Sequence, residues 1–174
     1  MANTVRITSG KFRGRAIATP GGKTHPMGER ERLAIFNMII DLVPGAVVLD
    51  TYAGSGALGI EALSRGAKKV VFIENNRGAA HVISENLKVL GVEGEVVVAR
   101  IPSYETDVSF DLVLADPPYD SFDLTEVAEL GKYVRDGGTL VLSHPGEAPL
   151  IKGLNLEKSR KYAGATISVY VKGN

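Results

Sequence analysis

The hydrophobic residues of the chain form short buried runs that alternate with segments of helical spacing. Mostly apolar runs predict five strands, over residues 47–49, 70–73, 95–99, 110–115 and 139–142. Apolar residues at helical spacing predict four helices, over residues 29–42, 57–64, 77–90 and 124–134, the last ended by Gly137-Gly138. This alternation is typical of βαβ units and predicts an α/β fold with a mostly parallel sheet and helices on both faces. Two further candidate strands, residues 156–162 and 166–171, predict an antiparallel hairpin at one edge.

The first 28 residues form a separate and strongly basic segment. Residues 5–18 alternate loosely and turn at Gly10 and Gly14, which predicts a short β-hairpin. Residues 1–28 contain no acid, and residues 1–32 hold 7 basic and 2 acidic side chains, a net charge of +5. Because the whole chain has a formal net charge of +0, the remainder carries −5.

This charge asymmetry predicts an N-terminal arm, residues 1–28, that contacts RNA and precedes a main domain, residues 29–174. The candidate phosphate contacts are Arg6, Lys11, Arg13, Arg15, His25, Arg30 and Arg32. The alternative is a solvated segment whose charges only keep the chain soluble.

Composition excludes several classes of protein. With 44% hydrophobic and 23% charged residues, the chain is an ordinary globular protein. The absence of cysteine excludes disulfides, thiolate zinc sites, iron–sulfur clusters and a cysteine nucleophile. The three histidines lack ligand spacing, so no metal is expected. No stretch resembles a signal peptide or a membrane span, so we expect a cytoplasmic protein, and a monomer.

The most informative motif, Asp116-Pro117-Pro118-Tyr119, ends the strand predicted at residues 110–115. A double proline cannot continue a central strand, because proline lacks an N–H and fixes φ. An acid, a rigid carbonyl-bearing turn and an aromatic ring therefore stand at the carboxyl end of a strand, where open α/β sheets bind ligands. This set of groups suits a flat base with an exocyclic amine. A rigid turn with an N-cap acid is the alternative.

A glycine-rich turn follows the strand at residues 47–49. Residues 54–59 read G-x-G-x-x-G between a strand and a helix, and Glu74 stands 20 residues after Gly54, where an acid can bind a ribose diol. The turn could be purely structural, or bind a nicotinamide dinucleotide or S-adenosylmethionine. Asp50 favours the last, because its charge opposes a pyrophosphate but tolerates an ammonium and a sulfonium. The candidate cofactor contacts are Asp50, Tyr52, Ala53, Gly54, Ser55, Gly56, Glu74, Asn75, Arg100 and Ile101.

Together these motifs resemble the RsmD family, the bacterial 16S ribosomal RNA guanine-N2 methyltransferases. The similar segments are Gly10 to Arg15, Ala34 to Asn37, Ala53 to Gly59, Glu61 to Ala67, Asp116 to Tyr119 and Tyr162 to Gly164. The resemblance implies a Rossmann-like class I methyltransferase with a seven-stranded sheet. It also implies S-adenosylmethionine as cofactor and a guanine of 16S ribosomal RNA, in the small ribosomal subunit, as substrate.

Two segments differ from the family pattern. His25-Pro26-Met27 stands where Arg-Pro-Thr is expected before the first helix. Arg100-Ile101 stands where an acid that contacts the adenine amine is expected. The second difference leaves adenine to backbone or apolar contacts, such as Ile101.

The expected catalytic residues are Asp116, Pro117, Pro118 and Tyr119. The Asp116 carboxylate and the Pro117 carbonyl would each accept an N–H bond from the amine, and Tyr119 would stack on the base. These groups would hold the amine of adenine or cytosine equally well. An adenine-N6 DNA or RNA methyltransferase is therefore one alternative, and a catalytically inactive RNA-binding assembly factor is another.

Overall fold

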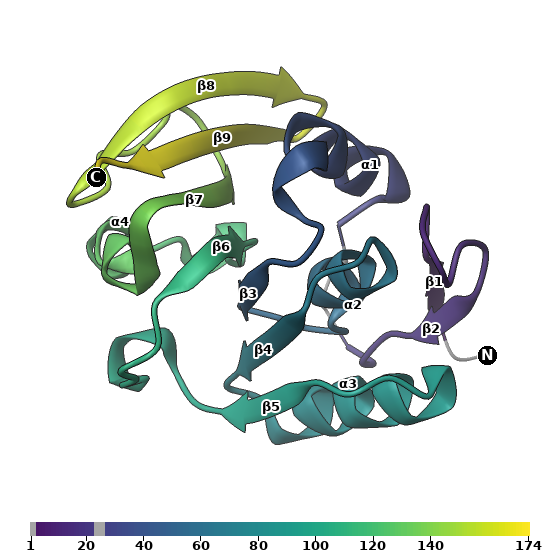
Figure 1. Ribbon diagram of the computed structural model, residues 1–174. Coiled ribbons are helices and arrows are strands. Elements are labelled where there is room, and N and C mark those ends of the chain that lie inside the picture. The colour runs from purple at the N-terminus through teal and green to yellow at the C-terminus, as the bar shows by residue number, and fades with distance from the viewer. Residues whose placement is uncertain (1–2, 23–26) are drawn as a thin grey trace.

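The computed structural model describes residues 3–22 and 27–174 and is built on a seven-stranded sheet. The strand order is β5-β4-β3-β6-β7-β9-β8, from bottom to top in Figure 1. Strands β3 to β7 are parallel, and β9 runs antiparallel between β7 and β8. The strands are β3 (Val47–Thr51), β4 (Lys69–Glu74), β5 (Glu95–Val98), β6 (Phe110–Ala115), β7 (Val134–His144), β8 (Leu154–Tyr162) and β9 (Ala165–Lys172). The predicted mostly parallel sheet with a C-terminal antiparallel hairpin is confirmed.

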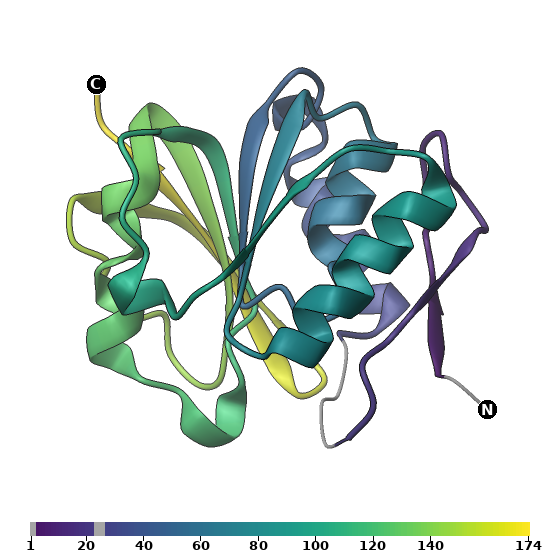
Figure 2. The same cartoon turned by 90° about the horizontal axis from the view of Figure 1, so that it is seen from below.

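Helices cover both faces of the sheet, as predicted (Figure 2). One face carries α1 (Glu29–Met38), α2 (Ala57–Ser64) and α3 (Arg77–Leu90), and the other carries α4 (Leu124–Ala128). Short 3₁₀-helices are η1 (Ile40–Leu42), η2 (Ile101–Ser103), η3 (Tyr119–Ser121) and η4 (Leu130–Tyr133). Within the described residues, no helix is long and apolar enough to cross a membrane.

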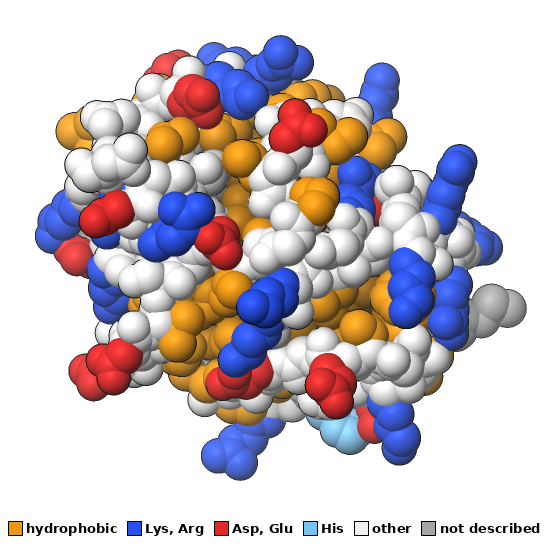
Figure 3. All heavy atoms as spheres, viewed as in Figure 1, with side chains coloured by type: hydrophobic (Ala, Val, Ile, Leu, Met, Phe, Trp, Pro, Cys, Tyr) orange, Lys and Arg blue, Asp and Glu red, His pale blue; other side chains and the backbone are white. Residues whose placement is uncertain are grey.

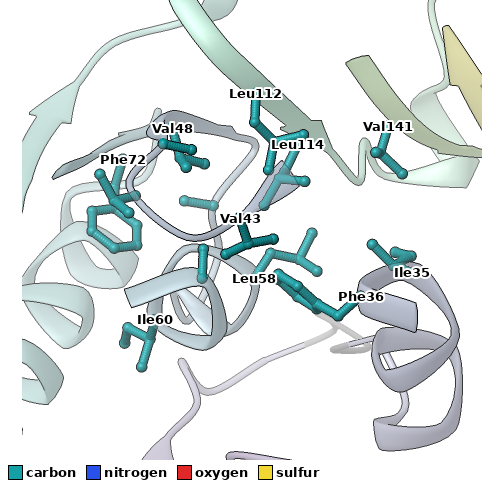
Figure 4. Close-up of a cluster of buried hydrophobic side chains, with 14 of the residues drawn as sticks. Ile35, Phe36, Val43, Val48, Leu58, Ile60, Phe72, Leu112, Leu114 and Val141 are labelled. Carbon is teal, nitrogen blue, oxygen red and sulfur yellow. The ribbon is translucent and has the colours of Figure 1, made fainter. Parts of the chain in front are cut away.

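Two buried clusters, one on each face, hold these layers together. Successive residues of a strand point to opposite faces, so Val48 and Leu49 enter different clusters. Val48 lies in one cluster with Phe36 of α1 and Leu58 of α2 (Figure 4). Leu49 lies in the other cluster with Val127 of α4. The near-continuous apolar runs of the sequence are therefore strands that are buried on both sides.

The segment after α4 differs from the prediction. The helix predicted over residues 124–134 ends at Ala128, and β7 begins at Val134 and runs through Gly137-Gly138. Phe110 pairs with Val134 whereas Leu112 pairs with Thr139, so the extra β7 residues form an irregularity in the ladder. Glycine is common at such irregularities. The prediction that these glycines end a helix is wrong.

The N-terminal residues form a separate two-stranded sheet of β1 (Thr4–Arg6) and β2 (Ala16–Ala18), outside the α1–α3 layer (Figures 1 and 2). Phe12 and Ile17 are buried in the same core cluster as α1 and α2. A Cβ on Gly10 would lie 1.9 Å from the carbonyl oxygen of Ser64, so the turn touches the end of α2. The β1–β2 hairpin is therefore packed on the helices, while the domain boundary at residue 28 stays a prediction.

A buried carboxylate on α2 fixes the hairpin and α1. Glu61 is 0% exposed and accepts hydrogen bonds from the Thr8 N–H and hydroxyl and from the Ser9 N–H. It also pairs with Arg32 Nε at 3.3 Å and with Arg65 Nε at 3.1 Å. One side chain therefore joins three segments of the chain.

Arg32 is a structural residue rather than a phosphate contact. Its side chain is 1% exposed, and besides the Glu61 pair it donates to the backbone carbonyls of Arg6 and Met27. These bonds turn the guanidinium inward. The prediction that Arg32 contacts RNA is wrong, because charge along a sequence does not show which cation has a buried partner.

We expect Glu61→Gln to lower the free energy of unfolding by about 3–5 kcal/mol, because it leaves the buried Arg32 without its counter-ion. Urea unfolding followed by circular dichroism measures this change. The control is Glu95→Gln, which breaks the Lys69–Glu95 pair, with both side chains 52% exposed. The control should change stability by at most about 1 kcal/mol. Equal effects of the two variants would contradict the role of Glu61.

Candidate functional site

A cavity of about 1100 Å³ opens at the carboxyl ends of β3, β4 and β6. Its wall includes the residues that follow these strands, residues 19–21, the start of α1, and residues 163–165, which are the β8–β9 turn and the first residue of β9. In Figure 2 the segment after β6 and the β8–β9 turn come together at the lower edge of the molecule. This is the edge at which open α/β sheets bind ligands.

The glycine-rich loop is fixed by the acid at the end of β4. Glu74 Oε2 accepts a hydrogen bond of 2.8 Å from the Gly54 N–H, and Oε1 accepts one of 2.8 Å from the Asn76 N–H. Gly54 has φ +58°, and open space lies where a Cβ would stand. A larger residue there would be strained and would project from the loop, so glycine keeps the backbone bare at the cavity wall.

Asp50 secures the other side of this loop. Its Oδ2 accepts a 2.8 Å hydrogen bond from the N–H of Gly59, in the first turn of α2. First-turn N–H groups of a helix lack intrahelical partners and are the groups that bind phosphates. Burial raises the pKa of Asp50 well above its usual range, and the charges of Asp116 and Glu74 raise it further. The α2 N-terminus thus already holds a carboxyl group, which disfavours a dinucleotide phosphate.

The cavity wall is rich in acids. Seven carboxyl groups line it, and they belong to Glu31, Asp50, Glu74, Asp116, Asp120, Asp123 and Glu126. The only arginines on the described wall are Arg100 and Arg32, and Arg32 is paired with Glu61. Such a surface favours a positively charged ligand. Residues 3–22 and 27–174 contain no group of three His, Cys, Asp or Glu side chains that could hold a metal ion.

Asp116 and Tyr119 share a partner on the neighbouring strand. Ser143 of β7 is 1% exposed, and its hydroxyl forms a hydrogen bond with the Tyr119 hydroxyl. Burial raises the pKa of Asp116 to about 6, while a hydrogen bond from Ser143 acts in the opposite direction. Burial also raises the pKa of Tyr119, so its hydroxyl stays protonated at neutral pH. The Asp-Pro-Pro-Tyr turn is therefore held from β7 as well as by its own prolines.

The structure brings most of the predicted site residues together. All four residues of the segment 116–119 line the cavity. Nine of the ten predicted cofactor contacts do so too, namely Asp50, Tyr52, Ala53, Gly54, Ser55, Glu74, Asn75, Arg100 and Ile101. Gly56 is not part of the wall; it directly precedes α2 with φ +79°, and a Cβ there would meet Ile83 at 3.1 Å.

Five of the predicted RNA contacts, Arg6, Lys11, Arg13, Arg15 and Arg30, are not part of this wall and lie on the β1–β2 hairpin and the start of α1. Figure 3 shows Lys and Arg side chains gathered over the hairpin at the right of the molecule. Arg6, Arg13 and Arg30 border an open hollow of about 500 Å³ between the hairpin and α1. Lys11 and Arg15 are exposed, the latter with one N–H on the Val89 carbonyl. His25 lies outside the described residues.

Two residues of the wall had no signal in the sequence. Ser143 and Glu126 are single polar residues in ordinary strand and helix segments, and only the fold brings them to the cavity. The β8–β9 turn did have a signal, because Tyr162 to Gly164 is one of the segments that resemble the RsmD family.

A Rossmann-like sheet with a glycine-rich loop after β3 and Asp-Pro-Pro-Tyr after β6 defines the methyltransferase class. A solved Escherichia coli structure, provisionally named methyltransferase YhhF, matches with a TM-score of 0.87 and 28% identity, over 98% of this chain and 99% of that one. The family model described as Conserved hypothetical protein 95 matches residues 5–171.

Relatives in sequence identify the family of methyltransferases to which the chain is similar. The Haemophilus influenzae "Ribosomal RNA small subunit methyltransferase D" is 36% identical over 132 residues, 71% of this chain and 68% of that protein. Its Escherichia coli namesake is 34% identical over 140 residues, 78% of this chain and 69% of that protein. The chain belongs to this family of methyltransferases, the RsmD family, as its motifs predicted.

Ser143 offers a test of the site that does not depend on turnover. We expect Ser143→Ala to move the midpoint of Asp116 titration above its native value of about 6, because the variant removes a hydrogen bond that favours the carboxylate. Carboxyl ¹³C NMR across pH 4 to 8 measures the midpoint.

Ser84→Ala is the control, because Ser84 is exposed on α3 and bonds only the carbonyl of Ala80. It should leave the Asp116 midpoint in place. An unchanged or lowered midpoint in Ser143→Ala would contradict the contact.

Proposed function

We propose that the chain transfers a methyl group from S-adenosylmethionine to the N2 amine of a guanine in 16S ribosomal RNA of the small ribosomal subunit. The observation that carries the proposal is one cavity walled by both the Gly54 loop with Glu74 and the Asp116 turn. The names of the Haemophilus influenzae and Escherichia coli relatives support ribosomal RNA as the substrate class.

The residues on the wall fit S-adenosylmethionine. Its ammonium and sulfonium suit a wall of carboxyl groups, and it has no phosphate to compete with Asp50 at the α2 N-terminus. Glu74 already accepts two backbone N–H bonds, and each of its oxygens keeps a lone pair for a ribose hydroxyl. When bound, the cofactor supplies a methyl group on a positively charged sulfur.

The protein's part in the reaction is to orient and stabilise the amine. The lone pair of a guanine amine is delocalised into the ring, so the nitrogen is a weak nucleophile. We infer that the Asp116 carboxylate and the Pro117 carbonyl accept its two N–H bonds and stabilise the positive charge that develops on the nitrogen. Tyr119 offers its ring for stacking, and Ser143 holds its hydroxyl. Asp116 or water then takes the proton.

The deciding experiment incubates the protein with methyl-labelled cofactor and small ribosomal subunits, naked 16S RNA or duplex DNA, and then identifies the modified nucleoside. We expect N2-methylguanosine from RNA. Methyladenine would favour the adenine-N6 alternative, and no product from any substrate would favour the inactive assembly factor.

Asp116→Ala tests the catalytic assignment. We expect a loss of methylation of at least about 100-fold, because the variant removes one of two groups that stabilise the reacting amine. Affinity for S-adenosylhomocysteine, measured by calorimetry, should stay within a few fold. Asp41→Ala, at an exposed acid on η1, is the control and should keep full activity. Full activity of Asp116→Ala would overturn the assignment.

The hairpin surface has its own test. We expect Arg13→Ala and Arg30→Ala each to weaken RNA binding and to reduce the slope of log affinity against log salt by about 1, since each removes a phosphate contact. Filter binding from 50 to 300 mM salt measures both quantities. Lys152→Ala removes an exposed cation beside η4, far along the chain from the hairpin, and should change neither quantity. An equal effect of this control would show that only net charge matters.

A further inference from the structure

A side-chain pair on the cavity wall has no part in the proposed reaction. Glu126 of α4 is 14% exposed at its side chain, and its Oε1 accepts a 2.6 Å hydrogen bond from the Tyr52 hydroxyl. Its Oε2 lies 3.8 Å from Arg100 Nη2, and the Arg100 side chain is 72% exposed. All three residues line the cavity. A largely buried carboxylate is thus fixed at the wall, with an exposed cation beside it.

The backbone conformation of Tyr52 supports a functional role for its hydrogen bond to Glu126. Tyr52 has φ +54° and is the one described residue other than glycine with a positive φ. Such a conformation is strained for a bulky side chain and tends to occur at ligand sites. Burial and the Glu126 charge raise the pKa of the Tyr52 hydroxyl, so it stays a donor. The strained backbone thus places a permanent hydrogen-bond donor on Glu126.

The position of Glu126 and Arg100 relative to Glu74 indicates which part of a ligand they would contact. On the proposed function, Glu74 at the end of β4 binds the ribose, so the attached base extends along the wall beyond β4. Arg100 and Ile101 follow β5, which pairs with β4, and Ile101 is only 3% exposed. Ile101 and Val127 give this part of the wall an apolar surface for a ring. Glu126 and Arg100 stand at that surface as an acceptor and a donor.

We propose that Glu126 and Arg100 recognise the edge of the cofactor's adenine, with the Glu126 carboxylate accepting from the 6-amino group and Arg100 donating to the adjacent ring nitrogen. Carboxylates only accept and guanidinium groups only donate, so the pair matches an edge that presents a donor next to an acceptor. At 3.8 Å the two side chains are too far apart for a hydrogen bond with each other, so both keep capacity for a ligand. Glu126 on α4 would then supply the acid for the adenine amine that is missing at Arg100-Ile101.

The test compares binding of S-adenosylhomocysteine and S-inosylhomocysteine by calorimetry. The inosyl compound carries an oxygen in place of the amine and an N–H in place of the ring acceptor. The donor and the acceptor of this edge are therefore exchanged. We expect the native protein to prefer the adenosyl compound by about 10- to 100-fold, the range for a two-bond base contact. Glu126→Gln should weaken adenosyl binding and reduce this preference to a few fold or less, because the new amide can donate to the inosyl oxygen.

Two further variants separate recognition from folding. Arg100→Ala changes an exposed side chain and should also lower the preference, with no change in the thermal midpoint. Glu129→Gln removes one negative charge directly after α4, at a side chain that is 45% exposed and is not part of the cavity wall. This control should leave the preference unchanged.

The possible outcomes are distinct. If Glu126→Gln lost the same affinity for both compounds and kept the native preference, the role of Glu126 in adenine recognition would be overturned. A native protein that binds both compounds equally would overturn it as well. A native protein that binds neither compound would refute the proposed cofactor itself. If the native protein preferred the adenosyl compound but methylated no RNA, the result would support the adenine site and refute the proposed RNA substrate.

Discussion

The buried carboxylate of Glu61 is the interaction on which the arrangement of this protein depends. It holds the loop at Thr8 and Ser9, the side chain of Arg32 on α1, and Arg65 at the end of its own helix. Its helix, α2, is held at the other end by Asp50 through the Gly59 N–H. Two acids thus fix α2, and α2 in turn fixes the glycine-rich loop and the N-terminal segment around one cavity. Displacement of Glu61 would disturb both sides of that cavity.

Charge is divided between the inside and the outside of the site. The cavity wall carries seven carboxyl groups, whereas the hollow between the hairpin and α1 is bordered by Arg6, Arg13 and Arg30. On the proposed function, phosphates of RNA would stay on the hairpin while an uncharged base enters the cavity beside Asp116. Burial of Asp116 at the end of β6 is the main cause of its raised pKa.

The sequence predicted the elements that have one local cause and missed those that depend on distant partners. The strands up to β6 and the helices up to α3 follow from apolar spacing and glycine stops. The helix predicted after Leu124 was too long, because Gly137-Gly138 suits a helix end and a β-irregularity equally well. Arg32 was misjudged because its partner Glu61 lies 29 residues away. Ser143 forms a hydrogen bond with Tyr119, 24 residues away, and Glu126 accepts one from Tyr52, 74 residues away. No local sequence pattern predicts contacts at such separations.

The proposed preference for guanine over adenine needs more than the amine that Asp116 would hold. Asp116 and the Pro117 carbonyl accept N–H bonds from any exocyclic amine, so they do not distinguish bases. The surroundings of Tyr119 could add such a distinction. Burial raises the pKa of Tyr119, the charges of Asp116 and Glu31 raise it further, and Asp120 is its neighbour in η3. On the two sides of its amine, guanine presents a ring N–H and a bare ring nitrogen, whereas adenine and cytosine present a bare ring nitrogen and no ring N–H. On the proposed function, a carboxylate beside the turn would accept from the ring N–H that guanine alone presents there, and this would favour guanine over the other two bases.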